Sequence, residues 1–134
     1  LSCFLCGFFY NFLFQKNMQL SFLKSKIHRA IVTETDIDYN GSISVDSDLL
    51  QAAQINEFER VEVYNITNGQ RFATYAIKAE AGSGKIGING AAAHLVGKGD
   101  LVIICCYCIL DKTQLEGFNP RILLVDKDNK ITNG

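Results

Sequence analysis

Short segments in which apolar and polar residues alternate follow one another along most of the chain. Such alternation is typical of β-strands that bury one face. It predicts strands over residues 22–33, 42–45, 61–64, 72–77 and 85–88, and continuous apolar runs predict two more over residues 101–110 and 122–125. Many short strands with little helix indicate a mainly β fold, either a closed barrel or a sandwich, because closure removes unpaired strand edges.

Only two short helical segments are expected between these strands. Asp46 or Ser47 can cap a helix that runs to Ala53, and residues 90–95 have the composition of a helical turn. The dipeptide Asn68-Gly69 separates two predicted strands and predicts a β-hairpin.

Residues 1–17 differ in composition from everything after them. They are apolar and rich in aromatic residues, yet they lack the basic start and the small-residue cleavage site of a secretory signal. They are also short for a bilayer span. We interpret Met18 as the natural start and residues 1–17 as an extension outside the native domain, with a membrane-associating tail as the alternative. Residues 18–134 then form a single domain.

Length and charge limit the classes of function. A chain of 134 residues with 48% hydrophobic and 20% charged residues builds one core and is near the size at which association helps. The formal charge is -1 and no run of Lys or Arg exceeds two residues, so a nucleic-acid partner is not expected.

Two motifs imitate binding sites that we do not expect. Cys3-x-x-Cys6 and Cys105-x-x-Cys108 have zinc-like spacing, but the second pair lies in an apolar strand where cysteine packs as a small buried residue. We therefore expect no metal, and the odd count of five cysteines fits a reducing cytoplasm. Residues 82–87 match G-x-G-x-x-G but precede a predicted strand, so no helix N-terminus is available for a nucleotide.

The peptide bond between Gly41 and Ser42 can undergo a self-cleavage reaction. An Asn-Gly dipeptide such as Asn40-Gly41 ordinarily forms a hairpin turn, and Ser42 would then be an ordinary serine at the start of a strand. A serine hydroxyl held against the preceding carbonyl can instead attack it and form an ester. Elimination of that ester followed by hydrolysis leaves a pyruvoyl group, which replaces pyridoxal phosphate as an electron sink.

Three further segments accompany this serine: Lys-Ile-His-Arg at 26–29, Asn-Ile-Thr-Asn-Gly-Gln-Arg-Phe-Ala-Thr-Tyr-Ala-Ile at 65–77, and Asn-Gly-Ala-Ala-Ala-His at 89–94. In this order the chain closely resembles the aspartate 1-decarboxylase family, pyruvoyl enzymes that form β-alanine for pantothenate and coenzyme A biosynthesis. The resemblance extends from Met18 to about Leu110 and is weak beyond Asp111.

The resemblance implies a double-psi β-barrel with short helices, assembled as a cytoplasmic homotetramer with active sites between subunits. It also implies cleavage between Gly41 and Ser42, a covalent pyruvoyl group from Ser42 that forms a Schiff base with L-aspartate, and neither metal nor nucleotide. The sequence leaves open whether a maturation factor assists cleavage.

Roles for individual residues also follow from the resemblance. Tyr75 is the proton donor and Thr74 polarises the Gly41 carbonyl. Arg71, whose planar fork suits a carboxylate, and Lys26 select a dicarboxylic amino acid. The substrate is oriented by Asn89 and by the backbone of Gly90, Ala91 and Ala92, with His28 and Tyr39 around the same cavity.

Two alternatives to aspartate decarboxylation remain at this point. One is a pyruvoyl enzyme that decarboxylates another amino acid. The other is an uncleaved, noncatalytic barrel that binds a partner.

Overall fold

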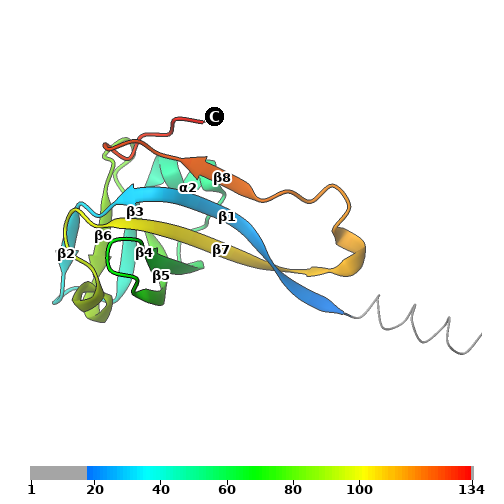
Figure 1. Cartoon of the computed structure of the whole chain (residues 1–134), viewed down its shortest axis with the longest axis horizontal. Helices are drawn as coiled ribbons and strands as arrows, with labels where there is room; N and C mark the ends of the chain where they lie inside the picture. Colours follow the sequence, from blue (N-terminus) through cyan, green and yellow to red (C-terminus); the bar gives the residue numbers. More distant parts are fainter. Residues whose placement is uncertain (1–17, 134) are drawn as a thin grey trace, which may run out of the picture.

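The computed structural model describes residues 18–133 and is mainly β, as predicted. The strands of this part of the chain form one sheet in the order β2-β6-β3-β5-β4-β7-β1-β8 (Figure 1). They are β1 (Gln19–Ile31), β2 (Glu34–Asp36), β3 (Ser42–Asp46), β4 (Arg60–Asn65), β5 (Arg71–Ala79), β6 (Ile86–Asn89), β7 (Leu101–Asp111) and β8 (Arg121–Leu124). The helical elements are α2 (Ser47–Ala53), η1 (Gly90–Leu95) and η2 (Lys112–Gln114).

The sheet curves on itself like a barrel. Only two residues, Val32 and Thr33, join β1 to β2, although these strands lie near opposite ends of the strand order. The Val32 amide donates to the Asp100 carbonyl at 2.9 Å and the Thr33 amide donates to the Ile86 carbonyl at 2.8 Å. The core inside this curve consists of branched aliphatic residues, with Ile27, Ile43, Val45, Val61, Val63, Ile86, Ile88, Val102 and Ile104 fully buried.

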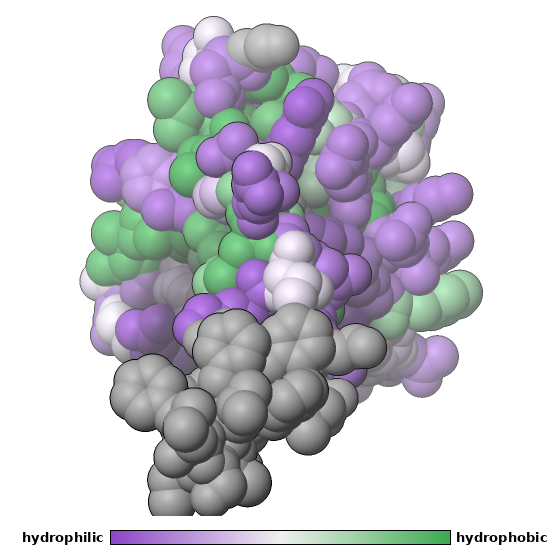
Figure 2. All heavy atoms as spheres, turned by 90° about the vertical axis from the view of Figure 1, so that its right-hand side faces the viewer, coloured by the Kyte–Doolittle hydropathy of each residue, from purple (hydrophilic) through white to green (hydrophobic). Residues whose placement is uncertain are grey.

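The outer part of the molecule is a ribbon rather than a barrel wall. β1 and β7 pair antiparallel along most of their length and extend together past the other strands, and β8 runs parallel to β1 (Figure 1). Figure 2 views the molecule from this side, where apolar residues reach the surface in separate areas among hydrophilic ones. The barrel character agrees with the prediction, and the double-psi topology stays a prediction.

Most predicted elements are confirmed. Asp46 is the N-cap of α2 and accepts a hydrogen bond from the Asp48 amide, and β4 and β5 form the hairpin predicted from Asn68-Gly69. The first strand begins three residues earlier than predicted. β2 was not predicted because its residues, Glu34–Asp36, are polar and exposed, so no alternation marks them.

The glycine-rich loop before β6 is anchored by a buried carboxylate. Asp46 accepts hydrogen bonds from the amides of Gly82 and Gly84 at 3.0 and 2.8 Å. Burial of the Asp46 carboxyl raises its pKa, but these amide donors outweigh burial and the net pKa lies below the usual value. These two loop amides are therefore already occupied by Asp46, and β6 follows the loop, as the sequence predicted.

Cysteine packs in β7 as predicted. Cys105 and Cys106 are buried and Cys108 is half-buried. Burial raises the pKa of the Cys105 thiol, and burial together with the Glu59 carboxylate raises that of Cys106 to about 12. Both thiols are consequently protonated at neutral pH. Cys3 and Cys6, with the rest of residues 1–17, lie outside the described residues.

Candidate active site

Ser42 is the first residue of β3 and is 1% exposed. Its Oγ donates to the Asn40 carbonyl at 3.1 Å and accepts a hydrogen bond from Asn89 Nδ2 at 3.0 Å. The pairing of β3 with β6 explains this contact, because Ser42 and Asn89 are direct partners in the antiparallel register. The sheet thus buries the serine hydroxyl and holds it with two neighbours.

The chain does not reach Ser42 through a hairpin. β2 pairs parallel with β6, β3 pairs antiparallel with β6, and the two strands lie on opposite sides of it. Gly41 is not among the glycines with positive φ, which a hairpin turn at Asn40-Gly41 would require. The hairpin interpretation of this dipeptide is therefore wrong, and residues 37–41 cross the end of β6 instead.

Gly90 makes the close approach to this crossing possible. Its φ is +70°, and a Cβ at this position would lie 2.7 Å from Gly41 Cα, 2.9 Å from Gly41 N and 3.1 Å from the Tyr39 carbonyl oxygen. These neighbours are backbone atoms that cannot rotate away. The site therefore needs glycine at position 90 for both space and backbone conformation.

We expect Gly90→Ala to slow cleavage of the Gly41–Ser42 bond strongly, because the new methyl group displaces the backbone that holds the bond. Gly117→Ala is the matched control, since Gly117 has φ of +77° and open space where the Cβ would be. Each variant has a backbone cost of roughly 1 kcal/mol from its positive φ. Intact mass after incubation measures cleavage, and equal cleavage in both variants would contradict a special role for Gly90.

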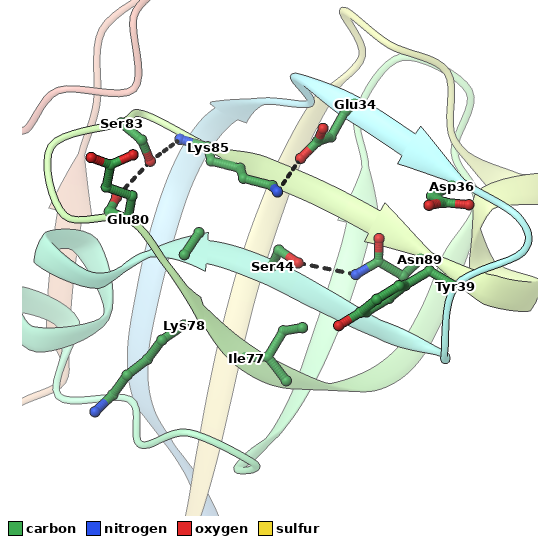
Figure 3. A pocket seen from close by; sticks show the side chains of 11 residues that line it. Glu34, Asp36, Tyr39, Ser44, Ile77, Lys78, Glu80, Ser83, Lys85 and Asn89 are labelled. Carbon is green, nitrogen blue, oxygen red and sulfur yellow. Dashed lines mark hydrogen bonds and ion pairs between the residues drawn. The ribbon is translucent and has the colours of Figure 1, made fainter.

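A cavity of about 450 Å³ lies on the outer face of β3 and β6. Asn89, Tyr39 and Ser44 line one end of it, and Glu80 and Ser83 line the other (Figure 3). An ion pair between Lys85 Nζ and Glu34 Oε1 at 2.5 Å crosses its rim. Tyr39 and Asn89 both line this cavity, and their role around a substrate stays a prediction.

Tyr75 lies next to Ser42 by strand register. β3 and β5 pair parallel with Ile43 opposite Ala76, so the residues just before this pair, Ser42 and Tyr75, share the outer face. Tyr75 is 38% exposed, and its ring centroid lies 6.4 Å from that of Phe58. Thr74 is half-buried and pairs with the fully buried Val61, so it faces inward.

Two cationic residues, Lys26 on β1 and Arg71 on β5, lie on another part of the outer face. Burial raises the pKa of the Cys105 thiol, and the charges of both residues act on it in the opposite direction, so both lie near Cys105. The Arg71 guanidinium lies 3.8 Å from the centroid of the Tyr64 ring. The Tyr64 hydroxyl is in turn 2.8 Å from that of Tyr107. An aromatic support of this kind limits the orientations of the guanidinium fork.

His28 lies on β1 beside Lys26 and pairs with Leu124 of β8. Its Nδ1 is buried without a hydrogen-bond partner in the described part of the chain. Burial, followed by the charges of Lys26 and Arg29, lowers its pKa. The imidazole is therefore neutral at pH 7.

The predicted site residues fall into two groups. Ser42, Gly41, Tyr39, Asn89 and Gly90 converge on one point, whereas Lys26 and Arg71 lie elsewhere on the sheet. Three strands separate β1 from β3, which corresponds to about 19 Å along the sheet. Arg71 also lies four residues from Tyr75 along β5, about 13 Å in an extended strand.

Ala91 and Ala92 follow Gly90 in η1. Ala91 is exposed and Ala92 is half-buried. The backbone of these two alanines follows directly after Gly90, the glycine that lies against Gly41 and Tyr39.

Two residues that contact predicted site residues were not themselves predicted to contribute. Ser44 accepts a hydrogen bond from Asn89 Nδ2 at 3.0 Å, and its spacing of two residues from Ser42 is the signal that would have identified it. Tyr64 lies opposite Arg71 in the β4–β5 hairpin, so the hairpin register was the signal for its contact with Arg71.

Comparison with known proteins identifies the family. The family model described as Aspartate decarboxylase matches residues 18–132. Aspartate 1-decarboxylase of Alkalilimnicola ehrlichii is 53% identical over 116 residues, covering 87% of this chain and 92% of the relative. The enzyme of Acetivibrio thermocellus is 54% identical with the same coverage, and that of Burkholderia pseudomallei is 53% identical, covering 85% of this chain and 90% of the relative. The chain belongs to the aspartate decarboxylase family.

No group of three or more His, Cys, Asp or Glu side chains with a metal-binding arrangement occurs among residues 18–133. No helix in that range is long and apolar enough to cross a membrane.

Proposed function

We propose that this protein decarboxylates L-aspartate to β-alanine and carbon dioxide, using a pyruvoyl group made from Ser42, and thereby supplies pantothenate and coenzyme A biosynthesis. The observation that supports this most strongly is the buried Ser42 hydroxyl, which is hydrogen-bonded to Asn40 and Asn89. The preceding residue, Gly41, lies directly against Gly90. Conversion of added L-aspartate to β-alanine by the purified protein tests the activity.

The residues around Ser42 fit the formation of a pyruvoyl group. The Ser42 Oγ attacks the Gly41 carbonyl carbon, the peptide C–N bond breaks, and the freed nitrogen takes the hydroxyl proton, which leaves an ester. Loss of the Ser42 α-proton then expels Oγ with the Gly41 carboxylate. Water replaces the nitrogen, which leaves as ammonia, and the new ketone oxygen comes from that water.

The hydrogen bonds of Ser42 support the first of these steps. Donation to the Asn40 carbonyl polarises the hydroxyl, and the Asn89 amide fixes the position of Oγ beside the preceding peptide. We assign Thr74 to the Gly41 carbonyl in this step. Once formed, a pyruvoyl group supplies the electron sink for decarboxylation.

We assign recognition of aspartate to Arg71 and Lys26. The guanidinium fork can donate hydrogen bonds to both oxygens of one carboxylate, and the contact with the Tyr64 ring supports the fork from one face. Lys26 offers the second positive charge near Cys105. Asn89 with the backbone of Gly90, Ala91 and Ala92 orients the substrate, and Tyr75 donates the proton to the carbon that loses carbon dioxide. We also place His28, which is neutral at pH 7, and Tyr39 around the substrate cavity.

Arg71→Lys tests this recognition. Lysine keeps the charge but loses the fork, so we expect the Michaelis constant for L-aspartate to rise about tenfold or more, the effect of losing one charge-assisted hydrogen bond. Cleavage at Gly41–Ser42 should be unchanged, because Arg71 takes no part in the bond changes that we assign to that step. An unchanged Michaelis constant would remove Arg71 from the substrate.

We further propose that two chains complete each site. Within one chain, Lys26 and Arg71 lie far from Ser42. A neighbouring chain is therefore needed to bring these cations to the serine. A homotetramer in the cytoplasm, as the family resemblance implies, provides such neighbours. Exposed apolar side chains, among them Phe58, Tyr75, Tyr107 and Ile109, offer surface for this association.

Mixed assemblies test the shared site. Ser42→Ala and Arg71→Ala are each expected to be inactive alone, since one lacks the cofactor and the other the carboxylate contact. Co-expressed in one cell, they should recover part of the parent activity, because some sites then combine an intact Ser42 with an intact Arg71 from the other chain. No recovery, with mixed assemblies verified by mass, would place both residues of a site in one chain.

The two alternative functions give different results. A pyruvoyl enzyme for another amino acid would cleave at Gly41–Ser42 but not convert L-aspartate. An uncleaved barrel that binds a partner would remain one chain. The kinship to enzymes named aspartate 1-decarboxylase favours the proposed function over both.

A further inference from the structure

Ser42 shares its asparagine with a second serine. Asn89 Nδ2 lies 3.0 Å from Ser42 Oγ and 3.0 Å from Ser44 Oγ, and donates to both. Ser44 is two residues further along β3 and lines the cavity with Asn89 (Figure 3). Because side chains of a strand alternate between faces, Ser42 and Ser44 point to the same side. The amide therefore bridges the cleavage serine and a neighbour for which we have assigned no role.

The second hydrogen bond determines how the amide is turned. The terminal torsion of an asparagine side chain is broad, so the carboxamide plane is set by its partners. An amide NH₂ group has two hydrogens in fixed directions. When one of them is held by Ser44, the other is directed toward residue 42. Without Ser44 the amide can rotate away, and Ser42 Oγ loses a fixed donor.

Maturation changes one of these partners and not the other. Ser42 Oγ departs with the Gly41 carboxylate, so the N–H that pointed at it loses its acceptor. The hydrogen bond to Ser44 is untouched, because Ser44 takes no part in the bond changes. The amide can thus keep its orientation toward residue 42 after the cofactor has formed.

We propose that Ser44 is a positioning residue that orients the Asn89 carboxamide toward residue 42 during cleavage and afterwards. The proposal rests on the proposed function, since it assumes that the Gly41–Ser42 bond is cleaved. Ser44 is only 7% exposed, so its hydroxyl needs a hydrogen-bond partner inside the protein, and Asn89 Nδ2 supplies one.

A matched pair of variants tests the hydroxyl separately from the shape. Ser44→Thr keeps the oxygen and Ser44→Val replaces it by a methyl group on the same branched frame. We expect purified Ser44→Val precursor to cleave about tenfold more slowly than Ser44→Thr, the effect of losing one hydrogen bond. Ser44→Thr should restore most of the parent rate. Cleavage is followed by intact mass, with thermal unfolding to compare stabilities and Ser21→Ala, an exposed serine on β1, as control.

A double-variant cycle shows whether Ser44 acts through Asn89. In an Asn89→Ala background, Ser44→Thr and Ser44→Val should cleave equally, because the amide that Ser44 orients is gone. Equal cleavage of the two variants in the parent background would overturn the proposal, and so would a tenfold difference that persists without Asn89. A parent chain that stays intact would instead overturn the proposed function itself.

Discussion

Ser42→Ala is expected to give a folded protein that stays intact at Gly41–Ser42 and does not decarboxylate aspartate. Alanine has no oxygen to attack the Gly41 carbonyl, so neither the ester nor the pyruvoyl group can form. The substitution leaves one N–H of Asn89 without its Ser42 partner, at a cost of about 1–3 kcal/mol. That is less than the roughly 5–15 kcal/mol by which domains of this kind are stable, so the fold should survive.

Intact mass, circular dichroism and an aspartate assay measure these three properties together. Ser21→Ala is the control, because it makes the same chemical change on the exposed face of β1 and should cleave like the parent. Normal decarboxylation by Ser42→Ala would contradict the assignment of Ser42 as the source of the cofactor.

Tyr75→Phe is expected to mature and then to turn over aspartate on the order of a hundredfold more slowly, or worse. The substitution deletes the hydroxyl and keeps the ring that lies beside Phe58, so packing is preserved. A loss of this size is the usual contribution of a positioned general acid. The exposed position of Tyr75, beside Ser42 in the register of β3 and β5, already argues against a purely core role.

The measurement is the turnover number of protein whose cleavage has been verified by mass. Parent-level turnover in mature Tyr75→Phe would mean that the proton comes from elsewhere, with an ordered water as the next candidate. Failure to cleave would assign Tyr75 to the shape of the precursor turn as well.

Local patterns predicted most of the strands, and non-local pairing explains what they missed. The hairpin at Asn68-Gly69 and the Asp46 cap follow from neighbouring residues, and both are present. Asn40-Gly41 has the same local signature as Asn68-Gly69 but does not form a hairpin, because β6, about fifty residues later, lies between β2 and β3. The residues near Asn40 and Gly41 do not indicate that a distant strand pairs between β2 and β3.

The candidate site shows the same division. Similarity to the family motifs pointed to Ser42, Asn89 and Gly90, and the structure brings these three together. The motifs did not indicate that Gly90 lacks a side chain because Gly41 lies against it. Nor did they indicate that Lys26 and Arg71 lie on the same part of the sheet, since that arrangement depends on β7 and β4 lying between β1 and β5.

If the chain makes its own cofactor at Ser42, the intact mass of the purified parent protein will reveal it. We predict two fragments that separate between Gly41 and Ser42, with the larger one, residues 42–134, lacking a free N-terminal amine. Reduction with borohydride should add two hydrogens to that fragment, as expected for a ketone. A single intact chain after prolonged incubation, or a larger fragment with an ordinary serine amine, would contradict the claim.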